Sequence, residues 1–358
     1  MKVSVIGAGI FGSTAAIYLA RAGHDVHLFD KGPLLGGASR CNQLRMHRGY
    51  HYPRSPETVA ECQRGNRSFY EEYPRAVITK TRPRTWQESK YYALARERNR
   101  TSAGAYAIFM DEHNLPYQPL QPYDPIVNPD TVQILFRVME GRFDYDLLAQ
   151  EIERKLVEAG VYTYFNIPKD VQRGLRWDFD QTVLAGYSAN GALLEDMGLK
   201  PPERLFELVE KPLIKLPDHW QHHSIVIMDG PFCSVDPYGD TGLHALGHVS
   251  RAIHNINVGT RPHIPPQYEG VIDAGVVTRP PRSRSMFMIE DARRYIPLLK
   301  DAEWRGSMFT VRAVLPDRDH DDARPTLVTR HSDKVLSIFS GKISSAVEAA
   351  KQVVEKVA

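Results

Sequence analysis

The chain of 358 residues has few cysteines and no long apolar run. Cys41, Cys62 and Cys233 are widely separated, which excludes a disulfide framework or a cysteine-based zinc site and favours a reducing compartment. No stretch approaches the roughly 18 to 20 apolar residues of a membrane-spanning helix. The first residues form a strand-like run rather than a basic segment followed by an apolar core. We therefore expect a cytoplasmic protein without a membrane span.

Neither sign of charge is in excess. Lys and Arg number 45 and Asp and Glu number 43, which gives a formal net charge of +2. This balance shows no footprint of a nucleic-acid binder, so we expect a small molecule as the partner. Hydrophobic residues at 42% and charged residues at 25% are typical of a globular protein, and the length suffices for two to three domains.

The first thirty residues carry a dinucleotide-binding pattern. Residues 2–6 are a short β-rich run, followed at once by Gly-Ala-Gly-Ile-Phe-Gly at 7–12. Residues 13–22 are small and apolar at helical spacing, and 26–29 form a second β-rich run that Asp30 closes. A glycine pattern between a strand and a helix, with an acidic residue after the second strand, is the context that binds a dinucleotide.

Each part of the pattern has a physical reason. Gly7 permits a tight turn, Gly9 lets a pyrophosphate approach the backbone, and Gly12 lets the helix pack closely on the strand. The helix N-terminus offers free N–H groups and a positive dipole end to the phosphates. Asp30 can accept both ribose hydroxyls, which argues against NADP. The residues expected to contact the dinucleotide here are Gly7, Gly9, Ile10, Phe11, Gly12 and Asp30.

The loop after Asp30 favours FAD over NAD. The glycine pattern alone does not separate these cofactors. Residues 31–42 form a small-residue loop rich in backbone donors, whereas the chain of a simple NAD dehydrogenase usually passes straight into another helix here. Such a loop can wrap a second phosphate and lead the chain toward an isoalloxazine ring.

This loop also carries a family resemblance. Residues 37–42, Gly-Ala-Ser-Arg-Cys-Asn, resemble the phosphate loop of the FAD-dependent oxidoreductases of the D-amino-acid oxidase superfamily. Residues 42–52 are similar to its L-2-hydroxyglutarate oxidase branch, with His47, Gly49 and Tyr52 at matching positions. Cys62 falls where that branch often places a cysteine. The positions that depart from the small or apolar residues usual in the family are Gln43, Leu44, Arg45 and Arg48.

The resemblance implies FAD as the cofactor and catalytic roles for His47 and Tyr52. Residues 179–190 resemble the strand that returns to the FAD site, and Val171 lies in what looks like a shortened β-meander on the adenine side. The FAD contacts that the resemblance implies in these segments are Lys31, Gly37, Ala38, Ser39, Asn42, Arg45, Met46, His47, Val171, Ala185, Gly186 and Tyr187.

The C-terminal part is predicted to be strand, strand and helix. Residues 308–314 are a strand in which Arg312, amid apolar neighbours, must reach an acid, a ligand or solvent. The segment resembles the superfamily's late strand, which carries an arginine near the substrate carboxylate. After a strand at 335–339, Ser-Gly-Lys-Ile at 340–343 opens a helix to residue 357 whose N-terminus would stabilise negative charge on reduced flavin. The contacts expected here are Arg312, Gly341, Lys342 and Ile343.

Proline-rich breaks and the resemblance together predict two domains. We expect an α/β fold, α+β overall, with a Rossmann-like FAD-binding domain of residues 1–81, 140–201 and 298–358. Residues 82–139 and 202–297 would form an inserted, sheet-rich substrate domain. An amphipathic helix over 143–160 and strands over 161–165, 204–215 and 224–236 are the main elements predicted between them.

The remaining histidines and cysteine do not predict a metal site. His244 and His248 have i, i+4 spacing, but the glutamate of a HExxH motif and a third ligand are missing, so we favour polar packing. The group His219, His222 and His223 is interpreted as surface, and Cys233 as a small buried hydrophobe.

The main functional hypothesis is an FAD-dependent oxidoreductase, either an oxidase or a dehydrogenase. It would move a hydride from a carbon bearing an amine or a hydroxyl to flavin N5. Arg312 would hold the substrate carboxylate, with Arg45 and Arg48 as additional candidates. His47 would accept the proton of a hydroxyl if the substrate is an alcohol; the alternative is that His47 only hydrogen-bonds the backbone. The alternatives are a flavoenzyme acting on a sugar or biosynthetic intermediate, and a non-catalytic FAD-binding module. The electron acceptor, oxygen or another carrier, stays open.

Overall fold

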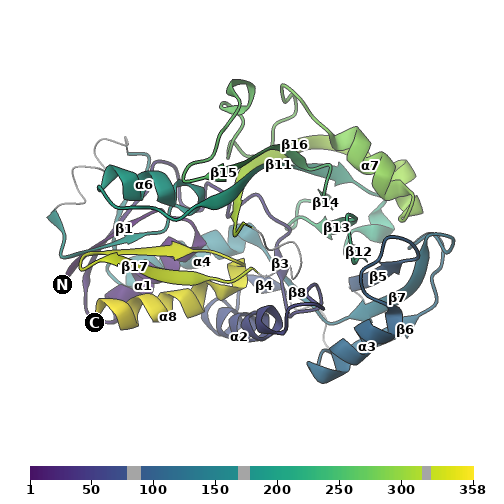
Figure 1. The fold of residues 1–358 in the computed structure, drawn as a ribbon, viewed down its shortest axis with the longest axis horizontal. Helices are drawn as coiled ribbons and strands as arrows, with labels where there is room; N and C mark the ends of the chain where they lie inside the picture. Colours follow the sequence, from purple (N-terminus) through teal and green to yellow (C-terminus); the bar gives the residue numbers. More distant parts are fainter. Residues whose placement is uncertain (79–89, 168–177, 317–323) are drawn as a thin grey trace.

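The computed structural model describes residues 1–78, 90–167, 178–316 and 324–358. The fold is mixed α/β and is built on two sheets, one mostly parallel and one mostly antiparallel (Figure 1). Val171 and the predicted start of the substrate domain at residue 82 lie outside the described residues. No helix in the described ranges is long and apolar enough to cross a membrane.

The first sheet has six strands in the order β17-β18-β10-β1-β2-β9. All its neighbours pair in parallel except β17 and β18, which are antiparallel. In β1 every residue after Lys2 is buried, as expected for a parallel strand covered on both faces. The strands are β1 (Lys2–Ile6), β2 (Asp25–Phe29), β9 (Tyr162–Tyr164), β10 (Gln181–Leu184), β17 (Leu327–Ser332) and β18 (Val335–Phe339).

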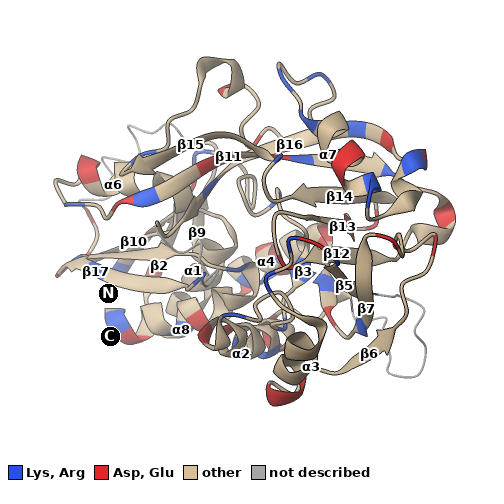
Figure 2. Ribbon diagram, turned by 45° about the vertical axis from the view of Figure 1, so that its right-hand side comes forward, with Lys and Arg blue, Asp and Glu red and all other residues tan. Residues whose placement is uncertain are grey.

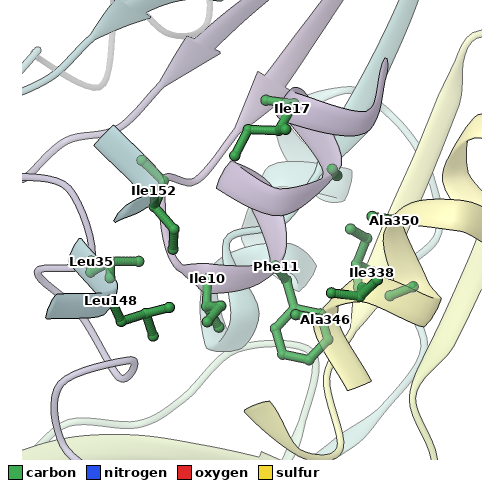
Figure 3. Packing of buried hydrophobic residues seen from close by; sticks show 14 of the residues in the cluster. Ile10, Phe11, Ile17, Leu35, Leu148, Ile152, Ile338, Ala346 and Ala350 are labelled. Atoms are coloured by element: carbon green, nitrogen blue, oxygen red, sulfur yellow. The ribbon is translucent and has the colours of Figure 1, made fainter. Parts of the chain in front are cut away.

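Helix α1 (Ile10–Arg21) packs between α4 (Tyr145–Glu158) and α8 (Ala346–Val357). Figure 3 shows Ile10 of α1 lying toward Leu148 of α4, and Phe11 lying toward Ala346 of α8. Because α1 is covered on several sides, its apolar residues run around most of its circumference. The predicted helix at 13–22 therefore exists and begins earlier, directly after Gly9.

The second sheet has nine strands, in the order β15-β11-β14-β13-β12-β5-β7-β6, with β16 also paired to β11. Its pairs are antiparallel except β12 with β5. The predicted strand at 224–236 is two strands, β12 and β13, separated by a turn. The strands are β5 (Lys90–Ala95), β6 (Tyr117–Leu120), β7 (Val132–Val138), β11 (Arg204–Lys215), β12 (Ser224–Met228), β13 (Cys233–Pro237), β14 (Leu243–His248), β15 (Ile253–Gly259) and β16 (Glu303–Val314).

The strand β16 changes the predicted domain boundary. The sequence assigns 298–358 to the FAD-binding domain, but β16 pairs with β11 along nearly its whole length, from Leu205 opposite Val314 to Lys215 opposite Glu303. We therefore place residues 303–314 in the second sheet, and only the chain from β17 onward in the first. A boundary drawn from prolines cannot detect such a pairing, because the partner strand lies about a hundred residues away in the sequence.

The remaining elements surround these sheets. Helix α2 (Pro56–Glu72) packs against α8. The strands before and after α2, β3 and β4, both pair with β8, which follows β7 of the second sheet in the sequence. The other elements are β3 (Arg45–Met46), β4 (Val77–Ile78), β8 (Gly141–Phe143), α3 (Ala103–Glu112), α6 (Asn190–Asp196), α7 (Ser285–Arg293) and the short 3-10 helices η2 (Tyr187–Ala189), η3 (Asp218–Trp220), η4 (Pro266–Tyr268), η5 (Pro297–Asp301) and η6 (Ile343–Ser345).

Candidate active site

One cavity of about 1260 Å³ is lined from both sheets. On the first sheet it opens at the carboxyl ends of β1, β2 and β10, which is where ligands bind in open α/β sheets. On the second sheet it is lined by residues of β11 through β14 and β16. Its volume exceeds the roughly 300–1,000 Å³ of common small-molecule pockets, so a cofactor and a small substrate can share it.

The glycines of the first turn serve two different needs. Gly7 has φ +111°, and a Cβ there would lie 2.5 Å from the Ala185 carbonyl oxygen at the end of β10. Gly9 has ordinary extended angles (φ −70°, ψ 177°), and a Cβ there would meet only Ser39 Oγ, at 3.2 Å. Gly7 is thus required by the packing of the chain, whereas Gly9 leaves open space in the cavity that a side chain would fill.

Asp30 and Ser39 organise the backbone around this space. Asp30 accepts hydrogen bonds from the Ala8 N–H (2.6 Å) and the Gly32 N–H (2.8 Å). Burial raises the pKa of Asp30, although these two hydrogen bonds oppose the shift. Ser39 Oγ accepts from the Ile10 N–H at the start of α1, at 3.1 Å. Both side chains line the cavity at the point where the sequence predicts the dinucleotide.

Most of the predicted site residues line this cavity. Those that do are Gly7, Gly9, Ile10, Phe11, Asp30, Lys31, Gly37, Ala38, Ser39, Asn42, Arg45, His47, Tyr52, Ala185, Gly186, Tyr187, Arg312, Gly341, Lys342 and Ile343. Gly12 and Met46 are absent from the described lining. Met46 follows Arg45 in a strand and points the opposite way, into the core. A Cβ on Gly12 would collide with the Gly7 carbonyl, so this glycine serves the turn itself.

The turn at residues 340–343 is shaped by contacts within the protein, whereas the sequence predicts a helix N-terminus there. The space beside Gly341 is filled by the Arg324 carbonyl, and the Gly341 N–H donates to Thr326 Oγ1 at 3.1 Å. Lys342 Nζ donates to the Arg324 carbonyl (3.0 Å) and lies 4.7 Å from the centre of the Tyr52 ring. Burial lowers the pKa of Lys342. The chain then enters η6 before α8, so a 3-10 turn rather than the α-helix itself faces the cavity.

Arg312 reaches an acid, which is one of the three partners that the sequence allows. Its Nε donates to Glu207 Oε2 at 2.6 Å, and Nη2 lies 2.5 Å from the same oxygen. The Arg312 side chain is 37% exposed. The partner Glu207 stands directly opposite Arg312 in the β11–β16 ladder, so the pair is a cross-strand ion pair at the cavity wall.

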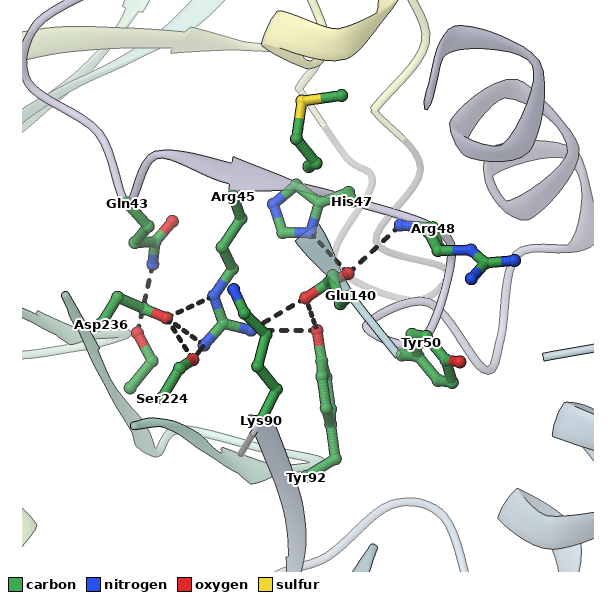
Figure 4. Close-up of polar contacts among 12 residues, drawn as sticks. Gln43, Arg45, His47, Arg48, Tyr50, Lys90, Tyr92, Glu140, Ser224 and Asp236 are labelled. Atoms are coloured by element: carbon green, nitrogen blue, oxygen red, sulfur yellow. Dashed lines mark hydrogen bonds and ion pairs between the residues drawn. The ribbon is translucent and has the colours of Figure 1, made fainter. Parts of the chain in front are cut away.

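Arg45 does not have free donors for a substrate. Its side chain is 3% exposed and lies at the centre of a buried network (Figure 4). Its Nε donates to Asp236 (2.7 Å), Nη1 to Tyr92 (3.0 Å) and Glu140 (3.3 Å), and Nη2 to Ser224 (3.0 Å). Its guanidinium is therefore a structural group that joins β3 to the second sheet, contrary to the expected carboxylate ligand.

Arg48 also turns away from the cavity. Its backbone N–H donates to Glu140 Oε1 at 3.1 Å, and its Nη1 donates to the Met139 carbonyl at 3.2 Å. It is not part of the described lining. The two alternatives to Arg312 that the sequence suggests are thus both committed to protein partners.

His47 lies between a buried acid and the cavity. Its Nδ1 is 3.6 Å from Glu140 Oε1, and its ring packs in a T-shaped arrangement with the Tyr52 ring, with centroids 5.9 Å apart. The Glu140 carboxylate is fully buried. Burial alone would raise the pKa of Glu140, but contact with His47 and the charges of Arg45 and Lys90 hold it well below its usual range. Glu140 is therefore an anion at neutral pH.

The sequence analysis missed Glu140 and Lys211. Glu140 is a single charged residue between β7 and β8, and only its position between two apolar strands could have drawn attention to it. Lys211 and Val209 alternate along β11 and both line the cavity, and Figure 2 shows acidic and basic positions along this strand. Lys211 Nζ forms no hydrogen bond or ion pair with any residue in the described ranges. Burial lowers the pKa of Lys211.

The other histidines and Cys233 lie close to where they were predicted. His219 and His222 are exposed, as expected, and His223 is half-buried. His244 and His248 lie on strand β14 and are buried; His244 Nε2 is 3.3 Å from the Trp220 carbonyl. Cys233 is buried, as predicted, and burial raises the pKa of its thiol to about 12. Among the described residues, no cluster of His, Cys, Asp and Glu could hold a metal ion.

Comparisons with known proteins agree with this architecture. The family model DAO, "FAD dependent oxidoreductase", matches residues 2–338. FAD-dependent monooxygenase kojA of Aspergillus flavus is 27% identical over 99% of this chain and 85% of its own. FAD-dependent monooxygenase FPY4 of Fusarium mangiferae is 25% identical over 96% of this chain and 88% of its own.

Solved structures share the fold. Glycine oxidase from Geobacillus kaustophilus has a TM-score of 0.67 at 14% identity, over 99% of this chain and 92% of its own. L-amino acid deaminase from Proteus vulgaris has a TM-score of 0.71 at 13% identity, over 99% and 93%. With the cavity, the glycine turn and the family match together, the chain belongs to the DAO family of FAD-dependent oxidoreductases and is an enzyme that uses FAD.

Proposed function

We propose that the enzyme oxidises a small, carboxylate-bearing substrate at a carbon that carries a hydroxyl or an amine. The observation that carries this proposal is the continuity of the cavity. It runs from the glycine turn and Asp30 to the face of the second sheet that bears Lys211 and Arg312, with His47 on its wall. A cofactor site and a polar substrate site are thus one space.

The residues at the first-sheet end fit FAD. Gly9 leaves room for a pyrophosphate beside the N-terminus of α1, where backbone N–H groups and the helix dipole favour anions. Asp30 uses each carboxylate oxygen for one backbone N–H, and further lone pairs remain for ribose hydroxyls. The loop at 37–42 would follow the second phosphate. Bound FAD supplies the oxidant, a two-electron acceptor that takes a hydride from the substrate.

Lys211 is the residue we propose for the substrate carboxylate, in place of Arg312. A lysine ammonium in a partly desolvated cavity is costly without an opposite charge. The other cationic side chains argued above have protein partners: Arg312 has Glu207 and Arg45 has Asp236 and Glu140. An anionic substrate group would supply the missing partner for Lys211, while the Arg312–Glu207 pair adds polar surface beside it.

The test of this proposal compares acids with their amides. FAD-loaded enzyme is mixed anaerobically with small amino acids and hydroxy acids, and then with the corresponding amides, while flavin absorbance is followed. We expect some acids to bleach the flavin and their amides to do so much less well. If acids and amides reduce the flavin equally well, the enzyme does not require a carboxylate on its substrate.

A monooxygenase is the second candidate, favoured by the names of the relatives at 25% and 27% identity. An enzyme of this kind needs a separate reductant for its flavin before oxygen can react. Flavin that stays oxidised with every substrate, and is reduced only when reduced nicotinamide is added, would favour this candidate over direct substrate oxidation.

A further inference from the structure

We infer that Glu140 positions His47 as the acceptor of a hydroxyl proton, and that the substrate is therefore a 2-hydroxy acid rather than an amino acid. This inference rests on the proposed function, because it concerns the same cavity and the same carboxylate-bearing substrate. It goes further in naming the atom that takes the proton, the residue that orients it and the class of substrate.

The carboxylate of Glu140 is fixed independently of His47. Glu140 lies between the last residue of β7 and the first of β8 and has no exposed side-chain surface. One oxygen accepts from the Arg48 N–H at 3.1 Å. The other accepts from the Tyr92 hydroxyl at 2.9 Å and from Arg45 Nη1 at 3.3 Å. These donors come from β5 and from the β3 region, so the position of the anion is set by the meeting of several elements (Figure 4).

The orientation of His47 follows from that anion. Nδ1 is buried and faces Glu140 Oε1 at 3.6 Å, while the side chain is 18% exposed on its cavity side. Figure 4 shows the second ring nitrogen pointing away from Glu140. An anion beside Nδ1 favours the tautomer that carries its proton on that atom. Nε2 is then left with a lone pair that faces the cavity, which is the arrangement of a base.

Other groups around His47 do not replace Glu140 in this role. The titratable and charged groups that face it are Tyr52 and His51 in the same loop, Arg45 next to it on β3, and Lys342 beyond the Tyr52 ring. Arg45 and Lys342 are cations that donate to other partners, and Tyr52 contacts the His47 ring in a T-shaped arrangement. Among the groups described around the ring, Glu140 is the anion that can bind the Nδ1 proton.

This arrangement suits an alcohol. When a 2-hydroxy acid becomes a 2-oxo acid, the O–H bond and the C–H bond at C2 both break. The hydroxyl proton goes to His47 Nε2, the O–H electron pair forms the carbonyl bond, and the C–H pair leaves as the hydride that FAD takes up. An amino acid that binds with a neutral amine already has a free electron pair on nitrogen and needs no base at this step.

The experiment measures the tautomer and the chemistry separately. FAD-loaded enzyme is labelled with ¹⁵N-histidine, and the His47 signal is assigned by its loss in His47→Gln. We expect a protonated Nδ1 and an unprotonated Nε2 in the wild type, and a loss of this preference in Glu140→Gln. Glu140→Asp, which keeps the charge, serves if Glu140→Gln does not fold, and is expected to retain part of the preference.

Anaerobic flavin reduction is then followed with pairs of 2-hydroxy acids and amino acids that share a carbon skeleton. We expect the hydroxy acid to reduce the flavin faster. His47→Gln should slow reduction about 10²- to 10⁴-fold, the range for a general base. Glu140→Gln should slow it by roughly tenfold or more, because the developing imidazolium then has no anion beside Nδ1. Ser224→Ala, which removes hydrogen bonds in the same network without touching Glu140, is the matched control and should retain the wild-type rate.

The outcomes separate this inference from the proposed function. If amino acids reduce the flavin and neither His47→Gln nor Glu140→Gln changes that rate or its pH profile, the proton-acceptor inference is wrong and the proposed function stands. A His47 signal with the proton on Nε2 in the wild type would also overturn the inference. If neither class of acid reduces the flavin, the proposed function is wrong and the inference falls with it.

Discussion

Arg312 of β16 and Glu207 of β11 form an ion pair across two adjacent strands, with Nε 2.6 Å from Oε2. The Glu207 side chain is nearly buried, at 9% exposure, whereas that of Arg312 is 37% exposed. Each charge therefore has a partner before any substrate arrives. Loss of Arg312 would therefore leave the nearly buried Glu207 carboxylate without its counter-charge.

Arg312→Leu should lower stability more than it lowers catalysis. The unpaired Glu207 carboxylate costs roughly 1 to 3 kcal/mol, the range for a buried group left unsatisfied. Replacing both residues by leucine should recover most of that loss. Urea unfolding of the single and double variants measures this difference. If the Arg312→Leu protein has wild-type stability and shows no substrate-driven flavin reduction, Arg312 rather than Lys211 binds the substrate carboxylate.

Lys211→Met should weaken the binding of acidic substrates while FAD stays bound. A hydrogen bond to a charged group is worth about 1.5 to 3 kcal/mol, which corresponds to roughly 10- to 100-fold in affinity. The KM for the acid should rise by that factor, and kcat should change less. Arg312→Leu provides the comparison on the same cavity wall. A KM that is unchanged in Lys211→Met would assign the lysine to another role.

Gly9→Val should abolish FAD retention without preventing folding. The φ and ψ of Gly9 suit any residue, so the backbone tolerates the change, but the side chain fills the space beside α1. Gly7→Ala is the contrast, because its φ of +111° and the nearby Ala185 carbonyl make any side chain unfavourable for the fold itself. Flavin absorbance per protein, with circular dichroism as the check on folding, distinguishes the two. Normal flavin content in folded Gly9→Val would remove this turn from the cofactor site.

Lys90 should make stability depend on alkaline pH. Burial, with the charge of Arg45, lowers the pKa of Lys90 to about 8. Because the unfolded value is higher, about 10.4, the unfolded chain binds more protons between these values, and stability rises with pH in that window. Relative to Lys90→Met, the wild type should gain on the order of 1 to 3 kcal/mol from below pH 8 to above pH 10. A constant difference in unfolding free energy across that range would contradict the lowered pKa.

Local patterns made the cofactor half of the fold predictable. The glycines at 7, 9 and 12, the helix after them and Asp30 at the end of β2 lie within thirty consecutive residues. The spacing of apolar residues, the spacing of glycines and an acidic residue after the second strand can all be recognised in such a stretch. The structure accordingly has β1, α1 and β2 close to their predicted bounds, with Asp30 and Ser39 on the cavity wall.

The substrate half depends on pairings that local sequence does not contain. Arg45 reaches Asp236, and His47 reaches Glu140, because β3 pairs with β8 and packs on the second sheet. Arg312 reaches Glu207 through the register of β11 and β16. A shift of one residue in that register would turn Arg312 to the other face. That Arg45 and Arg312 have protein partners, and that Lys211 has none in the described ranges, therefore becomes known only with the fold.

The central claim is that substrate alone reduces the bound flavin. The direct measurement is flavin absorbance of the purified, FAD-loaded enzyme under anaerobic conditions, with a panel of hydroxy acids and amino acids and with no nicotinamide present. Our account predicts that at least one acid bleaches the flavin, and that admitting an electron acceptor restores it. Flavin that every acid leaves oxidised, but that reduced nicotinamide bleaches, would contradict the account.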